Sequence, residues 1–400
     1  MPTSTTAPAR ASTSSATAVS WERARELAYG AAVAGPVRVV PLGRAGGLTL
    51  AGELRSPHPL PAFDTAAMDG YAVAGPGPWR VRGEVRAGAA WQGRLGGGEA
   101  VGISTGAPVP AGADAVLPLE LASAAGGLVS GPVLPPGRHV RRAGEDAPAG
   151  APLAPAGTRV GPALLGLAAS CGHDTLAVHT RPRVRVLVTG DELDRTGRPG
   201  PGRVRDALGP LLPGLVTELG GEAAGVRYVP DRPAGLLARE VLGVADAEVV
   251  VVTGSTSVGA TDQLRGLLGG AGARWAVDTV ACRPGHPMLL ARLGAARRWV
   301  VGLPGNPYAA LVAAHTLLGP LLAGLSGRRP APLPAVPVRG RLGPAPGITR
   351  LVPVAWEGPE ARILAGHGAA FLRGAAAGGA LAALPDTWTD GAPARLVLLG

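Results

Sequence analysis

The chain contains no lysine, and all 38 of its basic residues are arginine. Aromatic residues make up only 3% of the 400 residues, and no run of arginines is interleaved with them. Proteins that bind single-stranded nucleic acids stack the bases on aromatic side chains within a basic groove. The net charge of +10 therefore does not indicate a nucleic-acid partner. It is consistent with a small anionic ligand, or with a solvated basic surface that binds nothing.

Cysteine is also scarce, with only Cys171 and Cys282 in the chain. Two cysteines form neither a disulfide framework nor a metal-binding cluster, and this usage indicates a reducing compartment, the cytoplasm. Residues 1–19 are rich in Ser, Thr, Ala and Pro without the apolar core of a signal peptide, which predicts a disordered tail. The longest apolar stretch, residues 308–325, includes Pro320, so we expect a buried helix that ends near this proline and no membrane span.

Glycine and proline, by contrast, are abundant, with 63 and 41 residues. Four hundred residues are too many for one core, which predicts two to four domains. Up to about residue 180, apolar residues alternate with Pro/Gly turns, as in small β domains. From residue 183 onward strands alternate with helices, which is typical of a parallel sheet. A proline-rich linker then leads into a final segment, residues 335–400, that predicts a small β domain.

Three valine-rich segments each run into a glycine-containing turn: residues 183–193, 247–262 and 298–307. Such runs indicate strands buried on both faces of a parallel sheet. In open parallel sheets ligands bind beyond the carboxyl ends of the strands. We therefore expect Glu192 and the loops after the second and third strands to converge on one site. The alternative is that these turns only connect strands to helices.

The loop over residues 254–262 is built of small residues and ends in Asp262. Small residues allow a sharp turn that leaves backbone amides free for a ligand, and the carboxylate suits an accompanying metal ion. In the third loop Asn306 is expected to cap a helix that starts at Pro307, which would present amides to an anion. A capped helix start without a ligand explains the same residues.

Three further polar residues stand in turn-like settings. Asp69 precedes a glycine, and Asp-Gly is a common turn pair. Thr105 lies in a Thr-Gly-Ala-Pro turn, where its hydroxyl either serves a ligand or bonds its own backbone. Asp231 is expected to cap a helix over residues 232–242.

Taken in order, the motifs resemble the molybdopterin molybdenumtransferases, the molybdenum insertase family that includes bacterial MoeA and gephyrin. The resemblance runs from about Ser20 to the C-terminus and rests on AAMDGYA, STGAPVPAGADAV, GED, RPRVRVLVTGDEL, TGSTSVGATD, RPGHP and VVGLPGNP. It implies a multidomain α/β plus β fold. The implied parts are an elongated linker domain (20–54 and 136–180), an inserted β domain (55–135), a three-layer molybdopterin-binding α/β domain with a mostly parallel sheet (181–328) and a C-terminal β domain (329–400).

The resemblance also implies an activity: molybdenum from molybdate is inserted into adenylylated molybdopterin, with Mg²⁺ as cofactor and AMP as the leaving group. It implies a homodimer, with a molybdopterin adenylyltransferase as a candidate partner and neither nucleic acid nor membrane. The matching catalytic residues are Asp69, Thr105, Glu192, Asp262 and Arg283. The matching metal ligands are Asp69, Glu192, Asp231 and Asp262. The matching pterin-phosphate residues are Gly254, Ser255, Ser257, Gly259, Pro304, Gly305 and Asn306.

The sequence departs from the family pattern at several positions. Ala66 stands where the family usually has Ser, Leu208 where it has Asn, and Ser255 where it has Gly. Thr279 and His286 each stand where it has Lys. Arg283 replaces a lysine but keeps a fixed charge, whereas His286 introduces a group that can be neutral near pH 7. Two interpretations follow: a working insertase, or a non-catalytic pterin-binding or carrier paralogue. A scaffold protein on the same fold is a third.

Overall fold

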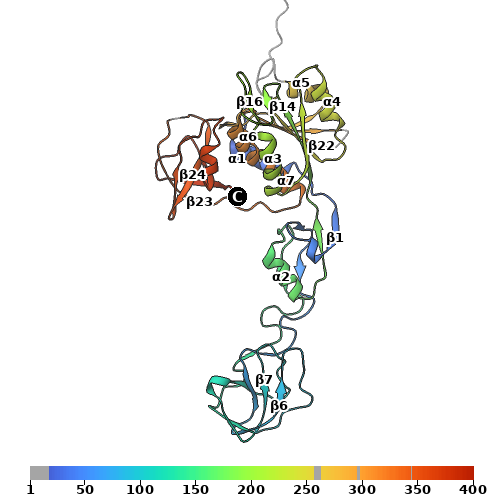
Figure 1. The fold of residues 1–400 in the computed structure, drawn as a ribbon, viewed down its shortest axis with the longest axis vertical. Helices are drawn as coiled ribbons and strands as arrows, with labels where there is room; N and C mark the ends of the chain where they lie inside the picture. The colour runs from blue at the N-terminus through green and yellow to red at the C-terminus, as the bar shows by residue number, and fades with distance from the viewer. Residues whose placement is uncertain (1–17, 256–262, 295–297, 344) are drawn as a thin grey trace, which may run out of the picture. The chain divides into compact units, whose positions relative to one another are not determined.

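The computed structural model describes residues 18–255, 263–294, 298–343 and 345–400. Two units separate along the chain, one comprising Met1–Val37 with His179–Gly400 and the other Arg38–Val178 (Figure 1). The tail expected over residues 1–19 lies outside the described residues except for its last two, of which Val19 forms a parallel bridge with Val280.

The first unit is built on a six-stranded sheet whose middle strands are the valine-rich segments. Its strands, in spatial order, are β17 (Glu222–Val229), β14 (Arg183–Thr189), β18 (Val249–Thr253), β22 (Arg298–Leu303), β21 (Leu289–Leu293) and β19 (Arg274–Val277). The first four run parallel, and β21 and β19 are antiparallel. Every residue of β18 is buried, which confirms the mostly parallel, doubly covered sheet.

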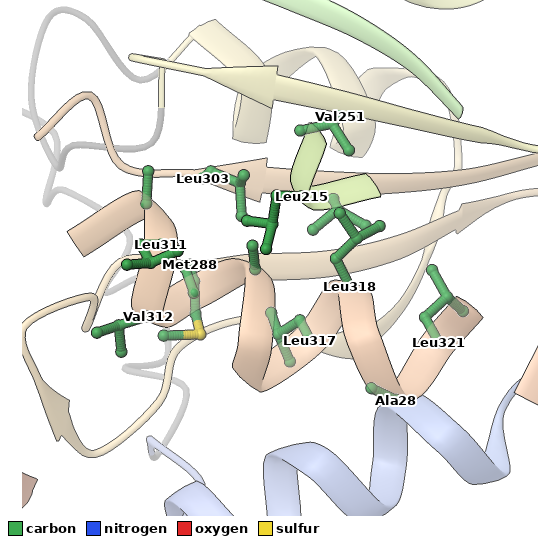
Figure 2. Packing of buried hydrophobic residues seen from close by; sticks show 14 of the residues in the cluster. Ala28, Leu215, Val251, Met288, Leu303, Leu311, Val312, Leu317, Leu318 and Leu321 are labelled. Atoms are coloured by element: carbon green, nitrogen blue, oxygen red, sulfur yellow. The ribbon is translucent and has the colours of Figure 1, made fainter. Parts of the chain in front are cut away.

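Helices cover both faces of this sheet. One face packs against α1 (Trp21–Gly30), α3 (Leu208–Glu218) and the long helix that follows β22, whereas the other packs against α4 (Leu236–Gly243) and α5 (Gln263–Gly270). Figure 2 shows Leu317 and Leu318 of the long helix among the side chains of the first face, with Val251 of β18. Because alternate residues of each strand face opposite helices, the three-layer arrangement follows from the sequence.

The long helix consists of α6 (Pro307–Ala313), the π-helical turn η3 (Ala314–Leu318) and α7 (Gly319–Leu325). The expectation that it ends near Pro320 is wrong, because this proline lies in the first turn of α7, where its missing N–H costs nothing. The helix, Pro307–Leu325, is long and apolar enough to cross a membrane, but it is largely buried inside the protein, as a core helix is.

A second sheet completes the first unit. Its strands, in spatial order, are β20 (Cys282–Arg283), β24 (Thr349–Glu357), β25 (Glu360–Ile363), β23 (Ala335–Arg339), β27 (Pro393–Leu398) and β26 (Ala380–Leu384). Since β26 also pairs with β24, five of these strands close into a barrel-like ring, with α8 (Arg373–Ala377) beside it. The sequence predicted a C-terminal β domain, but not that β20 joins it by parallel pairing with β24.

The second unit consists of small β-sheets. The largest has strands β8 (Ala115–Pro118), β5 (Gly70–Ala74), β7 (Glu99–Ile103), β6 (Trp79–Val85), β10 (Leu128–Ser130) and β9 (Ser123–Ala125). The remaining elements are β1 (Val37–Pro41), β13 (Thr175–His179), β2 (Thr49–Leu50), β3 (Leu54–Arg55), β12 (Pro152–Ala154), β4 (Thr65–Ala66), β11 (Val140–Arg141) and α2 (Pro162–Ser170). Within this sheet β6 pairs with β10 antiparallel and with β7 in parallel.

Candidate functional site

Two of the expected loops meet at the carboxyl ends of the sheet strands. In the parallel register Thr253 is paired with Val188 of β14 on one side and with Leu303 of β22 on the other, so the three strands end together. The backbone N–H of Gly254 donates to the carbonyl of Leu303 at 3.2 Å. The loops after β18 and β22 therefore touch through their backbones.

This close approach requires glycine at position 254 and leaves little room for a side chain at position 305. Gly254 has φ +85°, and a Cβ there would lie 2.9 Å from both the carbonyl oxygen and the hydroxyl of Thr189. A Cβ on Gly305 would lie 3.3 Å from the Cα of Gly254. Because glycine alone fits this geometry without strain, the small residues of the two loops serve close backbone packing.

Ser255 is buried, with only 4% of its surface exposed. Thr189 Oγ1 lies 2.9 Å from Ser255 Oγ and donates at 2.6 Å to the carbonyl of Thr253, so the serine hydroxyl donates to Thr189. The Ser255 side chain is thus bonded within the sheet end. The other expected residues of this loop, Ser257, Gly259 and Asp262, lie outside the described residues.

We expect Ser255→Ala to lower the free energy of unfolding by about 1 kcal/mol through loss of this hydrogen bond, while pterin affinity changes by less than about twofold. Urea unfolding and ligand titration measure the two effects. Ser326→Ala is the matched control, since Ser326 is also buried and donates to Leu322 O at 2.8 Å. A large loss of pterin affinity in Ser255→Ala alone would place the hydroxyl against the ligand.

Acidic residues gather after β14. Asp191 and Asp231 bind each other's backbone: the N–H of Asp191 donates to Asp231 Oδ2 at 3.2 Å, and the N–H of Asp231 donates to Asp191 Oδ1 at 3.1 Å. Asp231 does not cap a helix as expected, because α4 begins only at Leu236, after Gly235 with φ +88°. Asp191 lies directly after β14, but no motif singled it out as a site residue. Glu192 is exposed beside this pair in the chain.

These carboxylates do not form a closed metal cage. Among the described residues, no group of three or more His, Cys, Asp or Glu side chains is placed to hold a metal ion. Mg²⁺, however, is commonly held by one or two carboxylates together with phosphates of the substrate. The paired carboxylates of Asp191 and Asp231, each with one oxygen outside their mutual bonds, fit that mode of binding.

Leu208, where the family usually has an amide, begins α3 and is buried. Its N–H and that of Gly209 donate to Asp206 Oδ1 at 2.9 and 3.0 Å, and the hydroxyl of Tyr228 donates to Asp206 Oδ2 at 2.8 Å. Burial, then this bond to Asp206, raises the pKa of Tyr228. Asp206 therefore stabilises the start of the helix, and Leu208 belongs to the core.

A cavity of about 480 Å³ lies where the α/β sheet meets the C-terminal barrel. The residues lining it are Arg283, Pro284, Gly285, His286, Pro287, Pro304, Gly305, Asn306, Ala309, Arg350, Leu351, Val352, His367 and Ala369. The third loop, Pro304 to Asn306, thus forms one wall, and Arg283 joins it. Sequence reasoning missed Arg350 and His367, because they come from segments that are distant in the chain and carry no local motif.

Two arginines on adjacent strands line this cavity. Arg283 of β20 and Arg350 of β24 are direct partners in the parallel register. Gly285, with φ +104°, turns the chain after Arg283, and a Cβ there would lie 2.8 Å from Met288 Cε. Asn306 is the N-cap residue of α6, but its side chain makes no capping hydrogen bond and lines the cavity instead. The cavity is suited to an oxyanion.

The second unit holds Asp69 and Thr105 together. The backbone N–H and the hydroxyl of Thr105 both donate to Asp69 Oδ1, at 2.6 and 2.9 Å. These bonds, the backbone one first, hold the pKa of Asp69 below its usual value. Gly70 is required beside it, since a Cβ there would lie 2.0 Å from the carbonyl oxygen of Leu117. The structure therefore keeps an ionised carboxylate exposed on a rigid strand end.

Thr105→Val should raise the pKa of Asp69 and lower turnover about tenfold, because it removes one of two hydrogen bonds to the charged form. Titration of the Asp69 carboxyl carbon by NMR measures the first effect. Thr158→Val is the control, since the Thr158 hydroxyl donates to Pro155 O in another turn of the same unit. An unchanged Asp69 titration in Thr105→Val would contradict this account.

Comparison with known proteins decides the family. A model described as "MoeA N-terminal region (domain I and II)" matches residues 19–172, and one described as "Probable molybdopterin binding domain" matches residues 185–324. Molybdopterin molybdenumtransferase 2 of Mycobacterium tuberculosis is 36% identical over 302 residues, which cover 71% of this chain and 74% of that protein. The chain belongs to the molybdopterin molybdenumtransferase family.

Other relatives agree. Molybdopterin molybdenumtransferase 1 of Mycobacterium tuberculosis is 34% identical over 337 residues, 77% of this chain and 78% of that protein. A crystal structure of the molybdopterin biosynthesis protein MoeA from Pyrococcus horikoshii superposes with a TM-score of 0.75 at 28% identity, covering 96% of this chain and 99% of that one. The multidomain fold expected from the sequence is thereby confirmed.

Two further departures from the molybdenumtransferase family lie away from the cavity, and the structure gives no reason for either replacement. Ala66 is fully buried in β4, where its N–H donates to the carbonyl of Ala107 and its own carbonyl accepts from Gly106. Thr279 holds the N-terminal segment, since its carbonyl accepts the N–H of Val19 at 3.2 Å. Neither side chain lines the cavity among the described residues. His286 does line it.

Proposed function

We propose that this protein is a transferase of molybdenum cofactor biosynthesis that inserts molybdenum from molybdate into adenylylated molybdopterin and releases AMP. Family membership supports the reaction class. The observation that carries the proposal is the cavity in which Arg283 and Arg350 face the loop Pro304 to Asn306. Two fixed cations beside an exposed amide side chain suit a tetrahedral oxyanion such as molybdate.

Each part of the site has a proposed role. The backbone amide of Ser255 and the rest of that loop through Gly259 bind the pterin phosphate, whereas the Gly254 amide is bonded to the Leu303 carbonyl and Gly254 serves the turn. Arg283 stabilises charge on the oxyanion during transfer. Asp191 and Asp231, with Glu192 and Asp262, would hold Mg²⁺, which supplies charge neutralisation at the phosphoanhydride when bound.

We further propose a homodimer in which N-terminal parts of one subunit, with Asp69 and Thr105, complete the site of the other. One edge of the second unit supports this. β1 ends its three-stranded sheet, and Val37 and Val39 on it are 56% and 70% exposed. An unpaired edge strand with apolar side chains is a surface that another chain commonly covers.

The proposed substrate also indicates which kind of enzyme must act before this protein. The adenylylated substrate must come from an enzyme that transfers AMP to molybdopterin, so a molybdopterin adenylyltransferase is the proposed partner. Both cysteines are buried free thiols, which fits the cytoplasm as the proposed compartment.

The test is incubation of the purified protein with adenylylated molybdopterin, molybdate and Mg²⁺, followed by measurement of AMP and of the metal-loaded cofactor. Both products should form, and only when all three components are present. Tight pterin binding without either product would instead establish the less favoured alternative, a pterin-binding or carrier paralogue.

A further inference from the structure

The cavity combines two kinds of cationic group. Arg283 and Arg350 carry guanidinium groups, whereas His286 and His367 carry imidazoles, which are either neutral or cationic. No Asp or Glu is found among the described residues that line the cavity. The charge offered to an anion therefore depends on the protonation of the two imidazoles.

The orientation of the His286 ring is fixed by one hydrogen bond. Its Nδ1 lies 2.8 Å from the carbonyl oxygen of Val280. A carbonyl can only accept, so Nδ1 carries a hydrogen in every protonation state. The backbone closes the same turn, because the N–H of Val280 donates to the carbonyl of His286 at 3.1 Å. Proton exchange is therefore confined to Nε2.

Protonation changes what Nε2 offers to an anion. When the ring is neutral, Nε2 carries a lone pair and cannot donate to an oxyanion. When Nε2 takes up a proton, the ring becomes both a donor and a cation. We propose that His286 makes oxyanion binding in this cavity pH-dependent, with tight binding when Nε2 is protonated and weak binding when it is neutral.

Other charged and titratable groups lie around His286. Arg283 on β20 and Arg350 on β24 share the lining of the cavity with it. His367, whose Nδ1 lies 3.3 Å from the Leu364 carbonyl, is the other titratable group in the lining. On the far side, Arg265 donates to Asp278 at 2.9 Å and to the Pro287 carbonyl at 3.2 Å. The opposite charges of that pair largely cancel.

Linkage then requires that oxyanion binding be accompanied by proton uptake. A ligand that favours the protonated ring must raise the proton affinity of that ring by the same factor. The heat of binding should therefore vary with the ionisation enthalpy of the buffer. This proton uptake is a readout that a merely structural role of His286 would not produce.

The experiment is isothermal titration of the full-length protein with molybdate, and separately with sulfate, at pH 6 and pH 8. The wild type should bind each dianion about tenfold more tightly at pH 6, the effect of one added charge at contact distance. His286→Lys should bind tightly at both pH values, and His286→Gln weakly at both. His58→Gln, an exposed histidine of the other unit, should retain the wild-type dependence.

Two results would overturn the proposal. The first is that His286→Gln still binds the dianions with the wild-type pH dependence. The second is that His367→Gln loses this pH dependence while His286→Gln keeps it. The inference rests on the proposed function for the identity of the oxyanion, but its failure is distinguishable. Protein that binds both dianions in the pH-dependent manner and yet forms no cofactor would reject the insertase function alone. Cofactor formation with pH-independent oxyanion binding would reject the role of His286 alone.

Discussion

Replacing Arg283 with alanine is expected to lower kcat/KM about a hundredfold, the usual effect of removing one group that stabilises an oxyanion. Arg283→Lys should keep most of the activity, because the charge remains although the planar fork is lost. Neither change should lower the melting temperature, since Arg283 is exposed and its side chain forms no hydrogen bond or ion pair with another described residue. Steady-state kinetics and thermal unfolding measure the two effects.

Arg362→Ala is the matched control for Arg283→Ala. Arg362 is an exposed arginine of the same C-terminal barrel whose Nε lies 2.5 Å from Glu357 Oε1, and it does not line the cavity. The Arg362→Ala substitution should leave kcat/KM unchanged. If Arg283→Ala loses activity only in proportion to a loss of folded protein, the cavity is not the site of oxyanion transfer.

Acidification should destabilise the first unit through His315. This residue lies in η3 and is 6% exposed, and its Nε2 has no hydrogen-bond partner in the part of the chain that the structure describes. Burial first, then the charge of Arg25, lowers the pKa of His315 from 6.5 to about 4. The unfolded chain therefore binds a proton that the folded chain does not, and stability falls as the pH falls from 6.5 toward 4.

The expected loss over this interval is about 3 kcal/mol, since each pKa unit corresponds to about 1.4 kcal/mol. Hydrogen exchange of the amides of α1 and η3 measures it within this unit. His315→Leu should flatten the pH dependence, because it keeps an apolar side chain and removes the titration. His58→Gln should leave the dependence unchanged. An identical pH profile in His315→Leu would assign the acid sensitivity to other groups.

The parallel sheet could be predicted from the sequence because burial on both faces leaves a continuous apolar run. Val249 to Thr253 has no polar face, and the same holds for most of β14 and β22. The C-terminal limit of the long helix could not be predicted, because the π turn before Pro320 changes the hydrogen-bonding pattern without any local signal. The start of α4 was missed for a similar reason. Asp231 is an attractive cap, but it binds Asp191 instead.

The candidate site was predictable where its residues lie in one loop. Pro304, Gly305 and Asn306 form one wall of the cavity, and Arg283 lies in it. Thr105 and Asp69, each singled out from the sequence, are hydrogen-bonded to each other, which the sequence did not predict. The contribution of Arg350 depends on β20 leaving the α/β domain to pair with β24, which is a long-range event that no local pattern encodes. Roles for Ser257, Gly259 and Asp262 remain predictions outside the described residues.

The most direct test of the insertase function is a single-turnover experiment that measures AMP release and molybdenum bound to the pterin in the same sample. The account predicts that one AMP is released for each molybdenum inserted, and that both rise together only when molybdate and Mg²⁺ are present. Stoichiometric binding of adenylylated molybdopterin with no release of AMP would contradict it.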